Sequence, residues 1–136
     1  MRETHVFAFE GKDVITHLDP SVAGFATDVP SLALGNIPRR EISPSGSSSY
    51  VPSSLIAQIT PGGIQLVEYD PALLGFTKVG SGWYPKTLGK EYAEREIVAA
   101  AMSPSQFVVG LSGSRGGGGR LALFNLGPKD TLQLLQ

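Results

Sequence analysis

The segment from Glu96 to Leu135 constrains the fold of this chain more than any other part of it. It contains four apolar runs of β-strand length, separated from one another by Pro, Gly or Ser residues. The runs are Ile97–Met102, Phe107–Leu111, Leu121–Leu126 and Thr131–Leu135. Four short strands with tight links favour an antiparallel sheet, the unit from which β-propeller blades are built at roughly 40–50 residues per blade. The segment therefore predicts architecture, and it carries no catalytic motif.

The first half of the chain contains two further strand pairs. Thr4–Phe9 and Asp13–Leu18 are rich in β-branched and aromatic residues, as are Leu55–Thr60 and Ile64–Tyr69. Each pair is joined by a short link that contains glycine, which is the signal of a β-hairpin. A single short strand is expected at Ser31–Gly35, because apolar residues there lie between proline and glycine.

The remaining segments are less regular. Residues from about 38 to 54 are rich in serine and proline, and we interpret them as a flexible insertion inside one domain that spans residues 1–136. Residues 70–90 show no clear strand pattern. Glu91–Glu96 is long enough for one helical turn only.

Composition agrees with many short strands. The chain has 41% apolar and 17% charged residues, with 17 glycines and 10 prolines, which suits strands and turns better than long helices. Phe107–Leu111 and Leu121–Leu126 are apolar except for Asn125 and do not alternate, which predicts strands covered on both faces, as in stacked blades. The predicted fold is all-β, a partial β-propeller of two to three antiparallel blades from residues 4–18, 31–78 and 97–135.

Charge and cysteine content exclude several classes of function. The net charge is −1 and the basic residues are scattered, so direct nucleic-acid binding is disfavoured. The chain has no cysteine, which excludes disulfides, thiolate zinc sites and cysteine nucleophiles. No apolar run approaches the ~18–20 residues that span a membrane, so we expect a soluble, intracellular protein with no membrane contact.

The order of these motifs resembles one family. A hairpin (THVFAFEGKDVITHL) precedes a Gly-Phe and a strand (AGFATDVPSLALG), then come AQITPGGIQLVEYD, SPSQFVVGLSG and RLALFNLG. This order is similar to the propeller region shared by the large subunits of the damage-specific DNA-binding protein and of the cleavage and polyadenylation specificity factor, and by the propeller subunit of the branch-site splicing complex.

The resemblance implies a non-enzymatic protein-interaction scaffold in the nucleus, with other protein subunits as partners and no cofactor. A DNA-repair or ubiquitin-ligase assembly is preferred, and pre-mRNA splicing or 3′-end processing is the alternative. Family members contain complete propellers, so we expect the missing blades to come from a longer chain or from another chain. A self-contained small β-barrel or sandwich that binds a small ligand is the competing class.

Motifs that suggest catalysis or metal binding are incomplete. His5 and His17 lie on neighbouring predicted strands, and Asp13 or Asp19 could supply a third metal ligand. A structural or surface role for the two histidines is the stronger interpretation, so we expect no metal site. The sequence Gly110–Ser114 departs from the nucleophile elbow at its last position. Gly113–Arg120 lacks the lysine and the following helix of a phosphate-binding loop, and is expected to link two strands.

Aromatic and arginine residues are the remaining candidates for partner contact. Phe76, Trp83 and Tyr84 are of the type enriched at interface hot spots, although packing between blades is the stronger interpretation. Arg115 and Arg120 flank the glycine run and are included as candidate contacts. The alternating charges of residues 90–96 are expected to form a solvated face.

Overall fold

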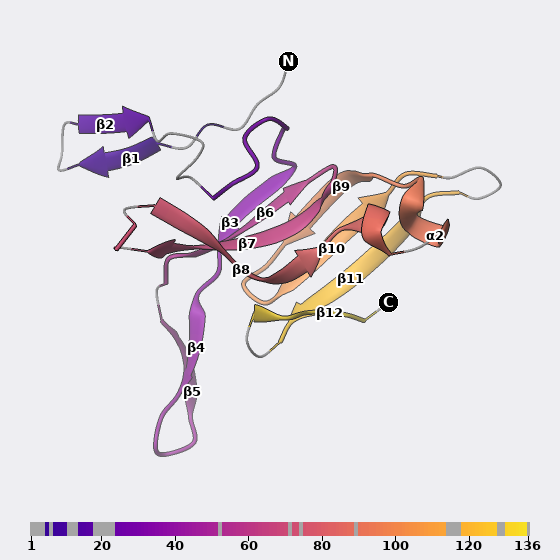
Figure 1. Ribbon diagram of the computed structural model, residues 1–136. Helices are drawn as coiled ribbons and strands as arrows, with labels where there is room; N and C mark the ends of the chain where they lie inside the picture. The colour runs from indigo at the N-terminus through magenta and orange to yellow at the C-terminus, as the bar shows by residue number, and fades with distance from the viewer. Residues whose placement is uncertain are drawn as a thin grey trace.

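The computed structural model describes residues 5, 7–10, 14–17, 24–51, 53–70, 72–73, 75–88, 90–113, 118–127 and 130–135. In these residues the protein is all-β, and every strand pair is antiparallel (Figure 1). Two four-stranded sheets form the body of the structure, and two hairpins, β1–β2 and β4–β5, form sheets of their own. The all-β prediction is confirmed.

The C-terminal sheet contains the four strands predicted from the apolar runs. Its strands are β9 (Ile97–Met102), β10 (Gln106–Leu111), β11 (Arg120–Leu126) and β12 (Leu132–Leu134), in the order β12-β11-β10-β9. Each strand pairs with its neighbour in sequence, because the links between them are too short for a crossover. This sheet is therefore a four-stranded meander, as the sequence predicts.

The first sheet is a second meander with an insertion. It contains β3 (Ala33–Asn36), β6 (Leu55–Thr60), β7 (Gly63–Asp70) and β8 (Gly75–Trp83), in the order β3-β6-β7-β8. The strand β8 falls in a region where the sequence shows no regular pattern. Its Gly80 and Gly82 have φ of +68° and +66°, and they lie where the pairing with β7 is irregular. The two glycines lower the strand propensity of this segment, and their positive φ permits the bulge. The strand therefore depends on its pairing with β7 rather than on its local sequence.

The hairpin predicted near the N-terminus is present. Its strands are β1 (Phe7–Glu10) and β2 (Val14–His17), and Phe7 lies opposite His17. Strand β1 ends at Glu10, one residue beyond the predicted end at Phe9. Residues 11–13, which link the strands, and the outer ends of the predicted strands at residues 4 and 18 lie outside the described part of the chain.

The serine-rich insertion contains regular structure. Its strands β4 (Arg39–Ile42) and β5 (Ser48–Val51) pair over four residues each, and Figure 1 shows the hairpin extending away from the two sheets. The turn between them has Gly46 at φ +86°, and its Ser43 amide donates to the Ser47 carbonyl at 2.8 Å. The insertion is thus a hairpin rather than an irregular loop, because a glycine supplies the positive φ of the turn and strand-forming residues flank it.

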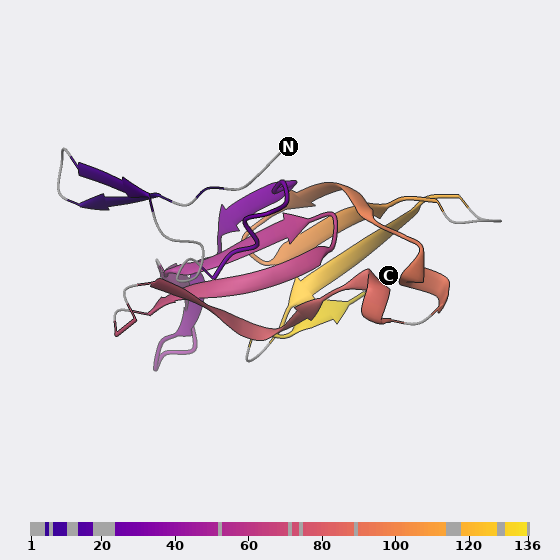
Figure 2. The same ribbon diagram turned by 45° about the horizontal axis from the view of Figure 1, so that its top comes forward.

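The two meanders pack face to face around one core (Figure 2). Like strands lie beside one another, with β3 against β9 and β8 against β12. The amide of Ile97 at the start of β9 donates to the carbonyl of Pro61 in the β6–β7 turn at 3.0 Å. The start of β9 pairs with the end of β10. The end of β6, next to Pro61, and the end of β10 therefore lie at the same end of the two stacked sheets. The second meander therefore repeats the first in strand order and in direction.

The core between the sheets is formed by alternate residues of the central strands. The fully buried members with the largest side chains come from β6, β7, β9, β10 and β11, together with Ile37. They are Leu55, Ile59, Ile64, Leu66, Ile97, Phe107, Val109 and Phe124. Because successive side chains of a strand point to opposite faces, the intervening residues lie on the far sides of the two sheets.

The far sides of the two sheets differ in how they are covered. In β6 and in the first five residues of β7, all but one residue is buried, because residues 24–32 run over that side and Phe25 packs on Ile56, Val67 and Phe76. In β10 and β11 burial alternates, and Leu121 is 75% exposed. The prediction that Phe107–Leu111 and Leu121–Leu126 are covered on both faces is therefore wrong for the described structure, and it holds instead for β6 and β7.

Two short helical turns connect the sheets. The turn η1 (Pro85–Thr87) and the helix α2 (Lys90–Ala93) lie between β8 and β9. The single helical turn expected near residue 91 is present, although it begins and ends earlier in the chain.

Candidate interaction surface

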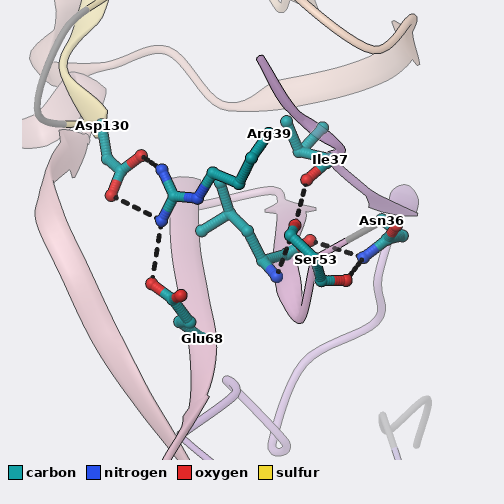
Figure 3. A network of polar contacts seen from close by, with 7 residues as sticks. Asn36, Ile37, Arg39, Ser53, Glu68 and Asp130 are labelled. Carbon is teal, nitrogen blue, oxygen red and sulfur yellow. Dashed lines mark hydrogen bonds and ion pairs between the residues drawn. The ribbon is translucent and has the colours of Figure 1, made fainter. Parts of the chain in front are cut away.

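Arg39 joins three segments of the chain at one end of the two sheets. It is the first residue of β4, and its guanidinium binds both carboxylate oxygens of Asp130, in the link from β11 to β12, and one oxygen of Glu68 on β7 at 2.9 Å (Figure 3). A planar guanidinium suits this geometry because it presents several donors in one plane. The hydrogen bond that Arg39 donates to the Asp130 carboxylate is the largest cause that raises the pKa of Arg39.

The backbone at Asp130 is held by a second contact. Asp130 has φ of +57°, a left-handed conformation that aspartate and asparagine tolerate better than most residues. Its carbonyl oxygen lies against Gly80 of β8, so closely that a Cβ at position 80 would lie 2.5 Å from it. Asp130 therefore connects the edge strand of the first sheet, the inserted hairpin and the second sheet.

The base of the inserted hairpin is fixed from the other side as well. The side-chain amide of Asn36 donates to the carbonyls of Ser53 and Leu55 at 2.7 and 2.9 Å, and the Ser53 hydroxyl donates to the carbonyl of Ile37 (Figure 3). Ile37 itself is 1% exposed. The hairpin thus leaves the body of the protein from an anchored base.

Replacing Asp130 tests the connection at Arg39. We expect Asp130→Ala to lower the free energy of unfolding by about 1–2 kcal/mol, because it removes charge-assisted hydrogen bonds and an αL-tolerant residue, while partial exposure of Arg39 limits the loss. Asp130→Asn keeps the backbone preference and is expected to cost less. Urea denaturation of the three proteins measures the difference, and equal stability of Asp130→Ala and the wild type would contradict the assignment.

The side of the C-terminal sheet that faces away from the core contains an apolar patch beside the polar side chains of Gln106, Asn125 and Gln133. Val108 lies between Phe107 and Val109, which are both buried in the core, so it points to the opposite side. Val108 pairs with Ala101 and Leu123, and the next pair in this direction along the two strands joins Gly110 and Leu121. We call the apolar patch on this side, formed by Ala101, Val108, Leu121, Leu123 and Leu135, the outer face.

The outer face is exposed and uncharged. Leu121 and Leu135 are 75% and 51% exposed, and the side chains of Ala101, Val108 and Leu123 help to line a shallow hollow of about 210 Å³. Apolar patches of this kind mark interaction sites when they are contiguous. The outer face can therefore bury apolar surface against a partner without desolvating a charge.

The predicted aromatic contacts lie in two separate clusters. Trp83 packs in the core between the sheets, with ring centroids 4.8 Å from Phe124 and 5.9 Å from Tyr92. Phe76 packs with Phe25, on the opposite side of the first sheet. Tyr84 is partly buried, its ring lies over Gly63 and Gly82, and burial raises the pKa of its phenol. The three aromatics do not gather on one surface.

The structure describes only one of the two arginines that were predicted as partner contacts. Arg120 begins β11, where it is exposed and lies opposite Leu111, whereas Arg115 lies outside the described residues.

The sequence does not predict the buried position of Arg95, which is 4% exposed. Its guanidinium donates to the carbonyls of Ser112 and Gly118, both at 2.9 Å. The charges of residues 90–96 are therefore not all solvated, because Arg95 turns inward and ties the glycine-rich link to the sheet.

Ser112, from the sequence compared with a nucleophile elbow, has a structural contact. The Ser112 hydroxyl accepts a hydrogen bond from the Glu96 amide at 3.0 Å. His5 and the backbone of His17 are described, and the described part of the chain holds no group of three potential metal ligands among His, Cys, Asp and Glu.

Comparison with protein families, curated proteins and solved structures gives no match to this chain. Within the described residues, no helix has the length and apolar character needed to cross a bilayer.

Proposed function

We propose that this chain is a non-enzymatic protein-interaction scaffold whose two meanders are stacked blades of a partial β-propeller. The repeated strand order supports this proposal, because β3 lies beside β9 and β8 beside β12, and β6 and β10 end on the same side. Blades of a propeller repeat in this way around their axis. The resemblance in sequence favours a nuclear DNA-repair or ubiquitin-ligase assembly, with RNA splicing or 3′-end processing as the alternative.

The apolar outer face is the observation that carries the proposal. In the first sheet, the equivalent side contains Leu55, Ala57 and Ile59, and the second sheet covers it completely. The outer face stands in the same relation to the second sheet but has no cover in the described structure. A further β-sheet, from another part of a longer chain or from a partner subunit, is therefore the element that we expect to pack there.

A self-contained β-sandwich that binds a small ligand is the second candidate. The single core shared by two four-stranded sheets favours it, because a sandwich has this layer structure. In a sandwich, however, the outer faces meet solvent and are commonly polar, whereas Leu121 and Leu135 are apolar and exposed.

Affinity purification of the full-length protein from cells, with and without Leu121→Asp, tests the proposal. The charge is expected to remove the bound subunits and to leave the fold intact, because Leu121 is 75% exposed. Leu73→Asp is the matched control, since Leu73 is 61% exposed and lies between β7 and β8. Recovery of ligase subunits supports the preferred assembly, and recovery of splicing or polyadenylation factors supports the alternative.

Two outcomes would contradict the proposal. Equal recovery of the same subunits by the wild type and Leu121→Asp would remove the outer face from the interaction. A monodisperse monomer that purifies without any stoichiometric partner subunit would favour the sandwich.

A further inference from the structure

A hollow of about 680 Å³ opens beside the inserted hairpin. It lies where the hairpin meets the β9–β10 and β11–β12 links, at the end of the C-terminal sheet that carries Asp130. Its volume falls in the range of ligand-binding clefts, which is roughly 300–1,000 Å³. Its lining includes none of the outer-face residues Ala101, Val108, Leu121, Leu123 and Leu135, although the two sites adjoin at Gln106, which also lines the shallow hollow on the outer face.

One wall of the hollow is formed by the hairpin. Pro38 and Tyr50 line it, and Tyr50 is 57% exposed. Pro104 lies in the β9–β10 link and also lines the hollow. A tyrosine ring together with prolines provides rigid apolar surface at a low cost in side-chain entropy. This wall therefore suits an apolar side chain of a ligand.

Another part of the lining is a row of side-chain amides. Gln106, Asn125 and Gln133 lie directly opposite one another on β10, β11 and β12, and all three line the hollow. The Gln106 amide nitrogen donates to the Asn125 oxygen at 3.1 Å. An amide side chain has two donors and an acceptor, so this bond, the one that joins the row among the described residues, leaves the three amides able to donate to and accept from a ligand. Alternating donors and acceptors are what an extended peptide backbone presents.

The charges that line the hollow are already compensated. Arg39 and Asp130 both line it and bind each other, and Glu68 holds the same guanidinium. A phosphate or a nucleic acid would need cationic groups that are not neutralised in this way. The lining thus favours a ligand that is recognised through neutral polar groups and apolar contact.

We propose that this hollow binds an extended peptide segment of a partner protein, with its backbone on the row of Gln106, Asn125 and Gln133 and an apolar side chain against Tyr50. The anchored base of the hairpin keeps the Tyr50 wall in position before the peptide binds, which lowers the entropic cost of binding.

Selection of random short peptides on the intact chain, followed by affinity measurement of the enriched peptides, tests this inference. Asn125→Ala is expected to weaken binding about threefold to tenfold, the effect of one lost hydrogen bond. Tyr50→Ala is expected to weaken it at least as much. Ile42→Ala is the control on the same hairpin, because Ile42 is 72% exposed and does not line the hollow.

The outcomes distinguish this site from the outer face. Peptides that bind the Leu121→Asp variant normally but bind the Asn125→Ala variant more weakly support the inference. This result does not depend on whether the proposed scaffold function is correct. Enriched peptides that respond to Leu121→Asp and not to Asn125→Ala or Tyr50→Ala would overturn it, and so would failure to enrich any peptide. Asn125 lies on β11, so its variant reports on the site even if Tyr50→Ala disturbs the hairpin.

Discussion

Phe124→Ala is expected to lower the free energy of unfolding by about 3–5 kcal/mol, the usual cost of truncating a buried phenylalanine. Phe124 is fully buried on β11, and its ring packs at 4.8 Å, centroid to centroid, against Trp83 at the end of β8. The substitution opens a cavity between the two sheets and removes the aromatic contact that joins them. Both effects act on the same core.

Leu121→Ala is the matched control on the same strand. Leu121 is 75% exposed, so its truncation is expected to change the stability by less than about 0.5 kcal/mol. Urea denaturation followed by tryptophan fluorescence measures both variants, and Trp83 reports directly on the contact. If Phe124→Ala and Leu121→Ala were equally stable, the two sheets would not share the core described above.

The strands were predictable where local signals act alone. β9 and β6 begin and end where the sequence predicts, because apolar runs there stop at proline or at a glycine turn. β8 was not predictable, since glycines within Gly75–Trp83 weaken the local pattern and the strand depends on its pairing with β7. The inserted hairpin was missed for a related reason, because its serine-rich composition resembles that of flexible segments.

The candidate site was much less predictable than the fold. Arg39 and Asp130 are 91 positions apart, and nothing in the neighbourhood of either residue indicates the other. The row of amides depends on the exact register of three strands, which a one-residue shift would move to the other face. The apolar runs indicate strands but not which of their faces remains uncovered.

Gln58→Leu is the second substitution for which we expect a large effect, about 3 kcal/mol or more of lost stability. Gln58 is fully buried on β6. Its amide nitrogen donates to the Ala26 carbonyl and to the Ser31 hydroxyl at 2.8 and 2.9 Å, and its oxygen accepts from the Ala26 amide at 2.9 Å. The Gln65 side chain donates to the same oxygen at 2.6 Å. Leucine fills a similar volume but removes these hydrogen bonds, including the bond of the buried Gln65 amide and both bonds of the partly buried Ala26 backbone to this side chain.

The effect should be local as well as global. Residues 24–32 cover the far side of the first sheet, and the bonds to Ala26 hold them there together with Phe25. In Gln58→Leu, we expect the Ala26 amide hydrogen to exchange with solvent much faster. The exchange rates of amides in β10 and β11 are expected to change only as much as the global free energy of unfolding changes. Gln106→Leu is the control, because the Gln106 amide is exposed and a leucine there leaves no buried polar group without a hydrogen bond. Unchanged exchange at Ala26 in Gln58→Leu would show that Phe25 and the hydrogen bond from the Leu32 amide to the Ile59 carbonyl anchor this cover without Gln58.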